Sequence, residues 1–221
     1  MKKSIIFDVD GTLWDSAQVV AESWNMVLSR HPETKDIHVT KEDMYRYMGH
    51  TMYEISCRMI PECVDALRAF IMQECMDNED RYLTDHSGTF YPALKETLES
   101  LRADCSLYIV SNCQDGYIQT MMRDGGLEAL IDDFECYGRT GREKGDNIRL
   151  LMERNRICSE DAVYVGDTAM DEAAAAAAGI PFIHAAYGFG EAKHPAAELT
   201  EIRKLPEVSR EIFAAGQSLR R

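Results

Sequence analysis

The chain has 221 residues, of which 45% are hydrophobic and 28% are charged, and its formal net charge is −14. This composition predicts a folded core, and the length predicts one domain or one domain with a sizeable insertion. The acidic balance, without a dense run of Lys and Arg, argues against a surface that binds nucleic acids or anionic membranes.

The seven cysteines predict neither a disulfide framework nor a zinc site, because their number is odd and no C-x-x-C pair occurs. The apolar run after Met1 is too short for a signal peptide, and no segment approaches the length that spans a membrane. We therefore expect reduced cysteines and a cytoplasmic protein.

The first expected element is a buried strand over residues 4–8 (SIIFD), and the stretch DVDGT begins at its end. It places Asp8 and Asp10 where burial is costly unless the carboxylates find partners. A simple turn is the alternative interpretation, since Asp and Gly are common turn residues. The rest of the chain decides whether these two carboxylates have partners in a polar site or belong to a simple turn.

The interval over residues 15–86 has no strand-like run and predicts helices only. An apolar stripe at helical spacing marks the first helix; it consists of Val20, Trp24, Val27 and Leu28. Residues 40–43 resemble a capping box that starts a second helix. A third helix is expected over 51–59 and a fourth over 61–83, so a helical insertion follows the first strand.

Strands and helices alternate in the remainder of the chain. The expected strands cover residues 106–111, 133–138, 162–167 and 181–188, and the expected helices cover 92–103, 145–156 and 170–178. Gly179 is the expected C-terminal cap of the last helix. This alternation is typical of an α/β fold with a doubly wound parallel sheet.

Polar residues gather at the carboxyl ends of these strands, where open α/β sheets place their chemistry. The set comprises Asp8, Asp10, Gly11 and Thr12 after the first strand, Ser111 and Asn112 after the second, Lys144, and Asp167, Thr168 and Asp171 after the fourth. Phosphoryl transfer needs a metal ion, a positive clamp and a nucleophile in line, and these residue types can supply them.

DVDGT, the strand-end Ser111, Lys144 and GDTAMD (166–171), in this order, resemble the four motifs of the haloacid dehalogenase superfamily. The helical insertion is similar to that superfamily's α-helical cap. The resemblance implies a Rossmann-like core over 1–14 and 87–221 with a cap over 15–86. The return segment at Tyr91-Pro92-Ala93, where Ala93 replaces the usual Gly, and the stretch at 177–190 resemble the phosphoglycolate-phosphatase-like branch.

The resemblance implies that Asp8 is the nucleophile and that Asp10 is the general acid and base. It also implies Mg²⁺ as the cofactor, held by Asp8, by the backbone carbonyl of Asp10 and by Asp167. Asp171 would hold a metal-bound water or orient Lys144. The alternative for Asp171 is an ordinary helix cap, since an acidic residue is favourable at a helix N-terminus.

Four further positions would bind the phosphoryl group together with Lys144, which also pairs with Asp8. They are the backbone amides of Gly11 and Thr12, the Ser111 hydroxyl and the Asn112 amide. Without the family pattern Lys144 would pass for one surface lysine among many, and Ser111-Asn112 for a turn.

The cap offers candidates for substrate selection. Gly49 and His50 lie in the expected specificity loop, and Arg58 could reach a carboxylate or a second phosphate, or be a surface arginine. Trp14 could stack on a leaving group or pack at the hinge between cap and core; both readings stay open.

We therefore expect a Mg²⁺-dependent phosphatase that acts on a small phosphorylated metabolite, phosphoglycolate-like, as a monomer or homodimer. A pyrophosphatase and a sugar phosphomutase of the same fold are the close alternatives, and a dehalogenase is a weaker one. A non-catalytic phosphate-binding regulator is the alternative from another class, although Asp8, Asp10, Lys144 and Asp167 are all present.

Overall fold

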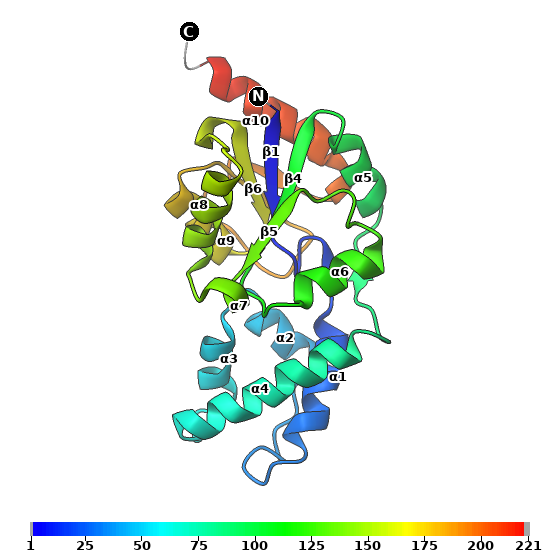
Figure 1. Cartoon of the computed structure of the whole chain (residues 1–221), viewed down its shortest axis with the longest axis vertical. Helices are drawn as coiled ribbons and strands as arrows, with labels where there is room; N and C mark the ends of the chain where they lie inside the picture. Colours follow the sequence, from blue (N-terminus) through cyan, green and yellow to red (C-terminus); the bar gives the residue numbers. More distant parts are fainter. Residues whose placement is uncertain (1, 219–221) are drawn as a thin grey trace.

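The computed structural model describes residues 2–218 and shows a six-stranded sheet in which every strand pairing is parallel (Figure 1). The strands lie in the order β5-β4-β1-β6-β7-β8. They are β1 (Lys3–Phe7), β4 (Cys105–Ser111), β5 (Asp133–Cys136), β6 (Ala162–Gly166), β7 (Phe182–Ala185) and β8 (Ala197–Leu199). The doubly wound parallel sheet predicted from the sequence is confirmed.

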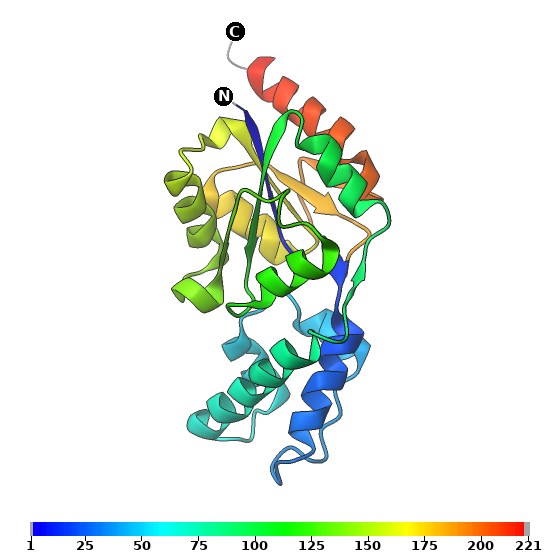
Figure 2. The ribbon, with the colours of Figure 1, turned by 45° about the vertical axis from the view of Figure 1, so that its right-hand side comes forward.

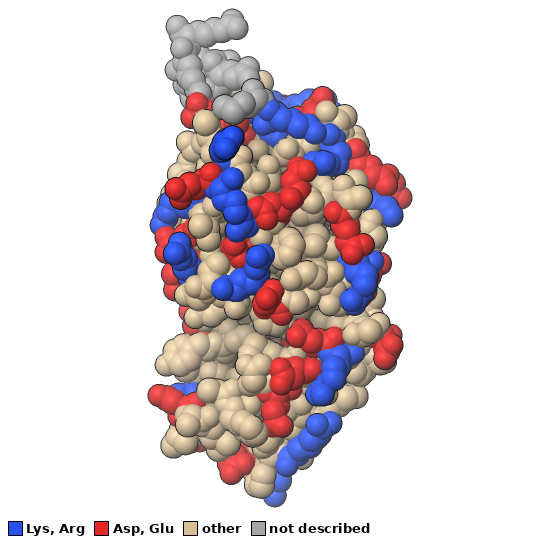
Figure 3. Space-filling view, viewed as in Figure 1, with Lys and Arg blue, Asp and Glu red and all other residues tan. Residues whose placement is uncertain are grey.

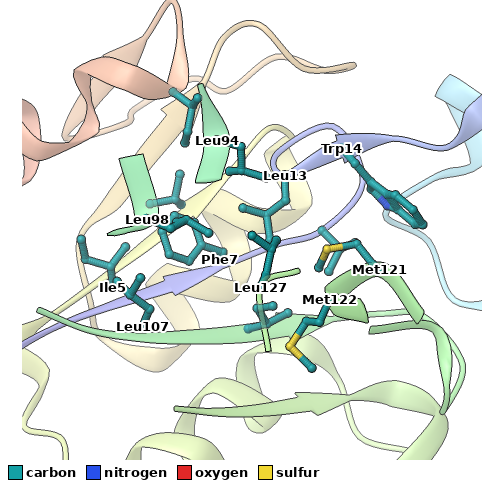
Figure 4. Close-up of a cluster of buried hydrophobic side chains, with 14 of the residues drawn as sticks. Ile5, Phe7, Leu13, Trp14, Leu94, Leu98, Leu107, Met121, Met122 and Leu127 are labelled. Carbon is teal, nitrogen blue, oxygen red and sulfur yellow. The ribbon is translucent and has the colours of Figure 1, made fainter. Parts of the chain in front are cut away.

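Helices cover both faces of the sheet because successive side chains of a strand point to opposite sides. On one face Ile6 packs with residues of α8 (Lys144–Arg154) and α9 (Ala169–Ala178). On the other, Ile5 and Phe7 pack with residues of α5 (Leu94–Leu101), α6 (Tyr117–Gly125) and α10 (Leu205–Ser218). Figure 2 shows these two helical layers, and Figure 4 shows the cluster around Phe7.

Strand β1 lies at the point where the winding of the sheet reverses. From β1 the chain continues on one side through β4 and β5, and then crosses to β6, β7 and β8 on the other side. Ligand sites of open α/β sheets form outside the carboxyl ends of the strands at such a switch point. Asp8, the first residue after β1, occupies this position.

Four helices lie between residues 15 and 89 of the chain and form a separate bundle with its own buried cluster. They are α1 (Ala17–Leu28), α2 (Lys41–Tyr47), α3 (Met52–Met59) and α4 (Asp65–Tyr82). The bundle lies beyond the carboxyl ends of the strands, at the opposite end of the molecule from both termini (Figure 1). The two connections to the sheet pair with each other as antiparallel strands, β2 (Trp14–Asp15) and β3 (Thr89–Phe90).

Several predicted elements needed correction. The strand expected over 133–138 ends at Cys136, because Tyr137–Thr140 turns into a short helix, α7. The strand expected over 181–188 ends at Ala185, and the helix expected over 61–83 begins only at Asp65. Strands β2, β3 and β8 were not anticipated, because two- and three-residue strands have no periodicity of their own. Helix α10 was not anticipated either.

Other local predictions are confirmed. Thr40 and Asp43 form the expected capping box of α2, and Gly179 ends α9 in a left-handed conformation.

All seven cysteines, each within residues 2–218, are free. Within the described range no helix is both long enough and apolar enough to cross a membrane. On the face seen in Figure 3 the Lys and Arg side chains are interspersed with Asp and Glu.

The left-handed backbone at Ala93 gives a test of the fold. Ala93 has φ 62° at the start of α5, a conformation that costs a non-glycine residue about 1–2 kcal/mol. We expect Ala93→Gly to raise the free energy of unfolding by about 0.5–1 kcal/mol, since glycine removes this strain but adds entropy to the unfolded chain. The same change at the exposed Ala173 inside α9 should lower it by about 1 kcal/mol. Urea denaturation of both variants checks the opposite signs, and a loss of stability in Ala93→Gly would contradict the argument.

Candidate active site

Lys144 lies at the centre of the polar cluster, where it joins the end of β1 to the first turn of α9. It is the first residue of α8, and its Nζ donates to Asp8 Oδ1 at 3.0 Å and to Asp171 Oδ1 at 2.7 Å. All three side chains are at least 96% buried. The predicted pairing of Lys144 with Asp8 is therefore present, and the same ammonium also holds Asp171.

The buried charges of this cluster do not balance. Carboxylate oxygens of Asp8, Asp167 and Asp171 lie within 4.8 Å of one another, and Lys144 bonds to two of these carboxylates, Asp8 and Asp171. With all three carboxylates ionised, three negative charges and one positive charge would leave two in excess (3 − 1 = 2). Burial and the neighbouring Asp171 accordingly raise the pKa of Asp8 to about 7, although Lys144 opposes the shift. Burial lowers the pKa of Lys144, but the charges of Asp171 and Asp8 outweigh this effect and keep the ammonium protonated.

Asp167, which follows β6, presents an unused ligand atom to this cluster. Its Oδ2 accepts a hydrogen bond from the Phe189 amide at 2.7 Å, while its buried Oδ1 has no partner among the described residues. Gly11, at φ +79°, lies so close to this carboxylate that a side chain at position 11 would collide with it. Oxygen ligands and two excess negative charges suit Mg²⁺, so the residues present fit the predicted cofactor.

Both interpretations of Asp171 hold at once. Its Oδ2 accepts from the Thr168 amide at 3.0 Å and from the Thr168 hydroxyl at 2.7 Å, which forms the capping box of α9. Its Oδ1 accepts from Lys144. The helix cap thus fixes the carboxylate that orients the lysine.

Asp10 lies two residues beyond Asp8, and its Oδ1 is held by three donors. Ser16 Oγ and the Tyr117 hydroxyl each lie 2.7 Å from Oδ1, and Trp14 Nε1 lies 3.0 Å from it. None of the described hydrogen bonds uses Oδ2. Burial raises the pKa of Asp10, while the bonds from Tyr117, Ser16 and Trp14 act in the opposite direction. A carboxyl group with a raised pKa and one free oxygen can exchange a proton with a substrate.

The amides of Gly11 and Thr12, which the sequence predicts to bind phosphate, are hydrogen-bonded within the loop in this structure. The Gly11 amide donates to the Trp14 carbonyl at 2.9 Å and the Thr12 amide to the Val9 carbonyl at 3.2 Å, so both are used inside the loop. Within the described residues the amides of Val9 and Asp10 have no such acceptor. The turn geometry, which the sequence pattern does not specify, thus shifts the available donors toward Asp8.

The predicted residues after β4 lie on the wall of a cavity between the helical bundle and the sheet. Ser111 and Asn112 line this cavity together with Asp10. Asn112 Nδ2 donates to the Gly49 carbonyl at 2.8 Å, which ties the bundle to the sheet. Gly49 has φ +89°, and a side chain there would meet Met170.

Of the other specificity candidates, only His50 lines the cavity with Gly49. Arg58 is exposed and donates to His50 Nε2 at 2.6 Å, so it contacts the loop from outside. Trp14 is fully buried and packs against Phe90 and Tyr117, with ring centroids 5.5 and 5.6 Å apart. This position matches packing at the connection between bundle and sheet, not stacking on a leaving group.

Sequence reasoning missed Ser16, Tyr117 and Glu79. Ser16 and Tyr117 hold Asp10, as described above. Glu79 of α4 is 2% exposed and lines the cavity. A signal for Glu79 was present, because Ile71, Cys75 and Glu79 follow one another at spacings of four residues and so share the buried face of one helix.

Residues 5–185 match the family model of haloacid dehalogenase-like hydrolases. The chain belongs to this family. A phosphoglycolate phosphatase of Nitrosospira multiformis is 27% identical over 201 residues, which cover 86% of each chain. A pyrophosphatase of Listeria monocytogenes is 23% identical over 170 residues, or 76% of each. The crystal structure of a predicted phosphoglycolate phosphatase from Haemophilus somnus superimposes with a TM-score of 0.83 at 20% identity, over 94% of this chain and 98% of that one. The superfamily resemblance and its Rossmann-like fold are confirmed.

The excess negative charge predicts how this hydrolase responds to Mg²⁺. In EDTA, Asp167→Asn should be more stable than the wild type by about 1–3 kcal/mol. Burial raises the pKa of Asp167, so the wild type must either bury a charge without a counter-ion or hold a proton on this carboxyl, and the amide avoids both costs. With Mg²⁺ at 100 times its dissociation constant the wild type should gain about 2.7 kcal/mol, and Asp167→Asn should gain little. Thermal unfolding with and without Mg²⁺ measures both effects. An equal gain in both proteins would show that Mg²⁺ binds elsewhere.

The raised pKa of Asp8 predicts a pH dependence of the metal-free protein. The pKa is 3.8 ordinarily and about 7 in the folded chain, so the folded state keeps a proton that the unfolded state releases. The free energy of unfolding should therefore fall as pH rises from about 4 to about 7. In EDTA, Asp8→Asn should flatten this part of the urea-denaturation profile, and the same change at the exposed Asp85 should not. Parallel profiles for wild type and Asp8→Asn would contradict the assignment of this pH dependence to Asp8.

Proposed function

We propose that the protein is a Mg²⁺-dependent phosphatase that hydrolyses a small phosphomonoester through an aspartyl-phosphate on Asp8. One observation carries the proposal: Asp8 is bonded to Lys144 at the winding switch of the sheet, and Asp10, two residues on, faces a cavity with one free oxygen. The family and its phosphatase relatives support the same reaction class.

In the first step the free carboxylate oxygen of Asp8 attacks phosphorus, and the bond from phosphorus to the ester oxygen breaks. Asp10 gives its proton to the departing oxygen, which leaves as an alcohol. Lys144 stays at Asp8 and balances charge on the phosphoryl oxygens. Ser111 and the amides near Asp8 orient that group.

In the second step Asp10, now ionised, removes a proton from water, and the resulting hydroxide attacks phosphorus. The bond from phosphorus to Asp8 breaks, and inorganic phosphate leaves. The three donors on Asp10 Oδ1 keep the carboxylate in one orientation through both steps. Mg²⁺, held by Asp8, Asp167 and the Asp10 carbonyl, would neutralise the oxygens of the transferred group.

We also propose that residues 15–86 form the cap that selects the substrate, with residues 1–14 and 87–221 as the catalytic core. The walls of the cavity come from both parts, so a substrate held there would contact the cap and the core together.

The cavity walls also weigh against the alternatives. A pyrophosphatase or a phosphomutase must hold a second phosphate, which calls for cations. Among the described residues that line this cavity there is no Lys or Arg, and Arg58 lies outside it. A non-catalytic regulator would not need Asp8, Asp10 and Lys144 in this geometry.

Phosphate release from a panel of phosphoglycolate, pyrophosphate, sugar phosphates, nucleotides and p-nitrophenyl phosphate tests the proposal. We expect release with Mg²⁺ but not with EDTA, and a loss of about 10³-fold or more in kcat for Asp8→Asn. Asp10→Asn should lose about 10²–10⁴-fold on alkyl esters and less on p-nitrophenyl phosphate, whose leaving oxygen needs no proton.

Asp85→Asn is the matched control, because this exposed carboxylate lies far along the chain from the strand ends. It should retain wild-type activity. Activity that persists in Asp8→Asn, or activity that does not depend on Mg²⁺, would rule out the mechanism.

A further inference from the structure

A second buried carboxyl group faces the cavity from the side of the helical bundle. Glu79 of α4 is 2% exposed and shares the cavity wall with Asp10 and Ser111. The remaining walls on the bundle side are mostly apolar; they include Val20, Trp24, Met44, Met48, Met52 and Ile55. A carboxylate in such surroundings needs a compensating partner.

The hydrogen bonds of Glu79 suit its ionised form. Trp24 Nε1 donates to Oε2 at 2.6 Å, and Gln114 Nε2 donates to Oε1 at 2.9 Å. Both donors are N–H groups without acceptor capacity, so each carboxyl oxygen acts as an acceptor. Gln114 lies on the loop that also carries Ser111, and it links Glu79 to the phosphate-binding side of the cavity.

The described cavity wall holds no cation that would stabilise Glu79 in its ionised form. The lining contains no Lys or Arg, and burial followed by the charge of Arg58 lowers the pKa of His50. Gln114 is 92% buried, and its Oε1 has no hydrogen-bond donor. Burial raises the pKa of Glu79 to about 8, although the bonds from Gln114 and Trp24 oppose the shift. The cavity therefore presents acceptors that call for a positively charged donor.

We propose that the substrate is a short aminoalkyl phosphomonoester whose ammonium group binds Glu79 and Gln114 Oε1 while its phosphate lies at Asp8. This inference rests on the proposed phosphatase function and specifies its leaving group. The alkyl chain lies against the apolar wall of the bundle. The ammonium supplies the positive charge that is missing next to Glu79 and a hydrogen-bond donor for Gln114 Oε1.

The same arrangement disfavours a carboxylate at that end of the substrate. A glycolate group would place its carboxylate at Glu79 with no cation nearby. Because like charges in a buried site repel strongly, Glu79 would then have to stay protonated, whereas its two hydrogen bonds suit the ionised form. Glu79 thus separates this chain's expected substrate from the one named for its phosphoglycolate phosphatase relatives.

Four esters that differ at one end test the proposal: 2-aminoethyl, 2-hydroxyethyl and propyl phosphate, and phosphoglycolate. With Mg²⁺, we expect kcat/KM for 2-aminoethyl phosphate to exceed that for the two neutral esters about 10-fold or more, and that for phosphoglycolate to be lowest. Glu79→Gln should lose about 30-fold on the amine and change propyl phosphate less than about 3-fold. Asp77 is an exposed carboxylate on α4, and Asp77→Asn removes the same charge as Glu79→Gln. This control should leave the order of the four esters unaltered.

The outcomes separate the two proposals. If p-nitrophenyl phosphate and all four esters resist hydrolysis, the phosphatase function fails and this inference fails with it. If hydrolysis depends on Mg²⁺ and Asp8 but phosphoglycolate matches the amine, only the ammonium assignment is overturned. The ammonium assignment is also overturned if Glu79→Gln lowers kcat/KM equally for all four esters, or if the hydroxyl and amine esters react at equal rates. Circular dichroism checks folding, and if Glu79→Gln does not fold, the wild-type order of the four esters decides.

Discussion

The rest of the site depends on the charge balance around Lys144. Its ammonium lies between Asp8 and Asp171 in a buried space that also holds Asp167, and one cation cannot neutralise three carboxylates. Such a cluster lowers the stability of the metal-free chain and creates a place for a divalent cation. The excess charge at Asp8 is therefore a cost to the fold and the basis of the proposed chemistry.

The fold brings these charges together by simple means. Asp8, Ser111 and Asp167 each end a parallel strand, and β1 lies between β4 and β6, so the three side chains meet at one edge of the sheet. Lys144 enters from the start of α8. The capping box of α9 fixes Asp171, so a contact that stabilises the start of a helix also positions Lys144.

The strand-end residues and the helical insertion could be predicted from sequence because they depend on periodicity and chain order. The donors around Asp10 could not, since Tyr117 reaches it from a helix 107 residues away in the chain. The loop hydrogen bonds of the Gly11 and Thr12 amides could not be predicted either, because the direction of an N–H in a tight loop depends on its exact dihedral angles. Glu79 was overlooked although a glutamate at an apolar position of α4 was visible; only the packed bundle shows that this face lines a cavity.

Calorimetric titration of Mg²⁺ into the metal-free protein, in two buffers of different ionisation enthalpy, tests the charge balance most directly. The account predicts one ion bound per chain and a release of protons to the buffer, because the ion displaces protons that burial holds on Asp8 and Asp167. Absence of binding, or binding with no proton release, would contradict the claim that a divalent cation compensates the buried carboxylates.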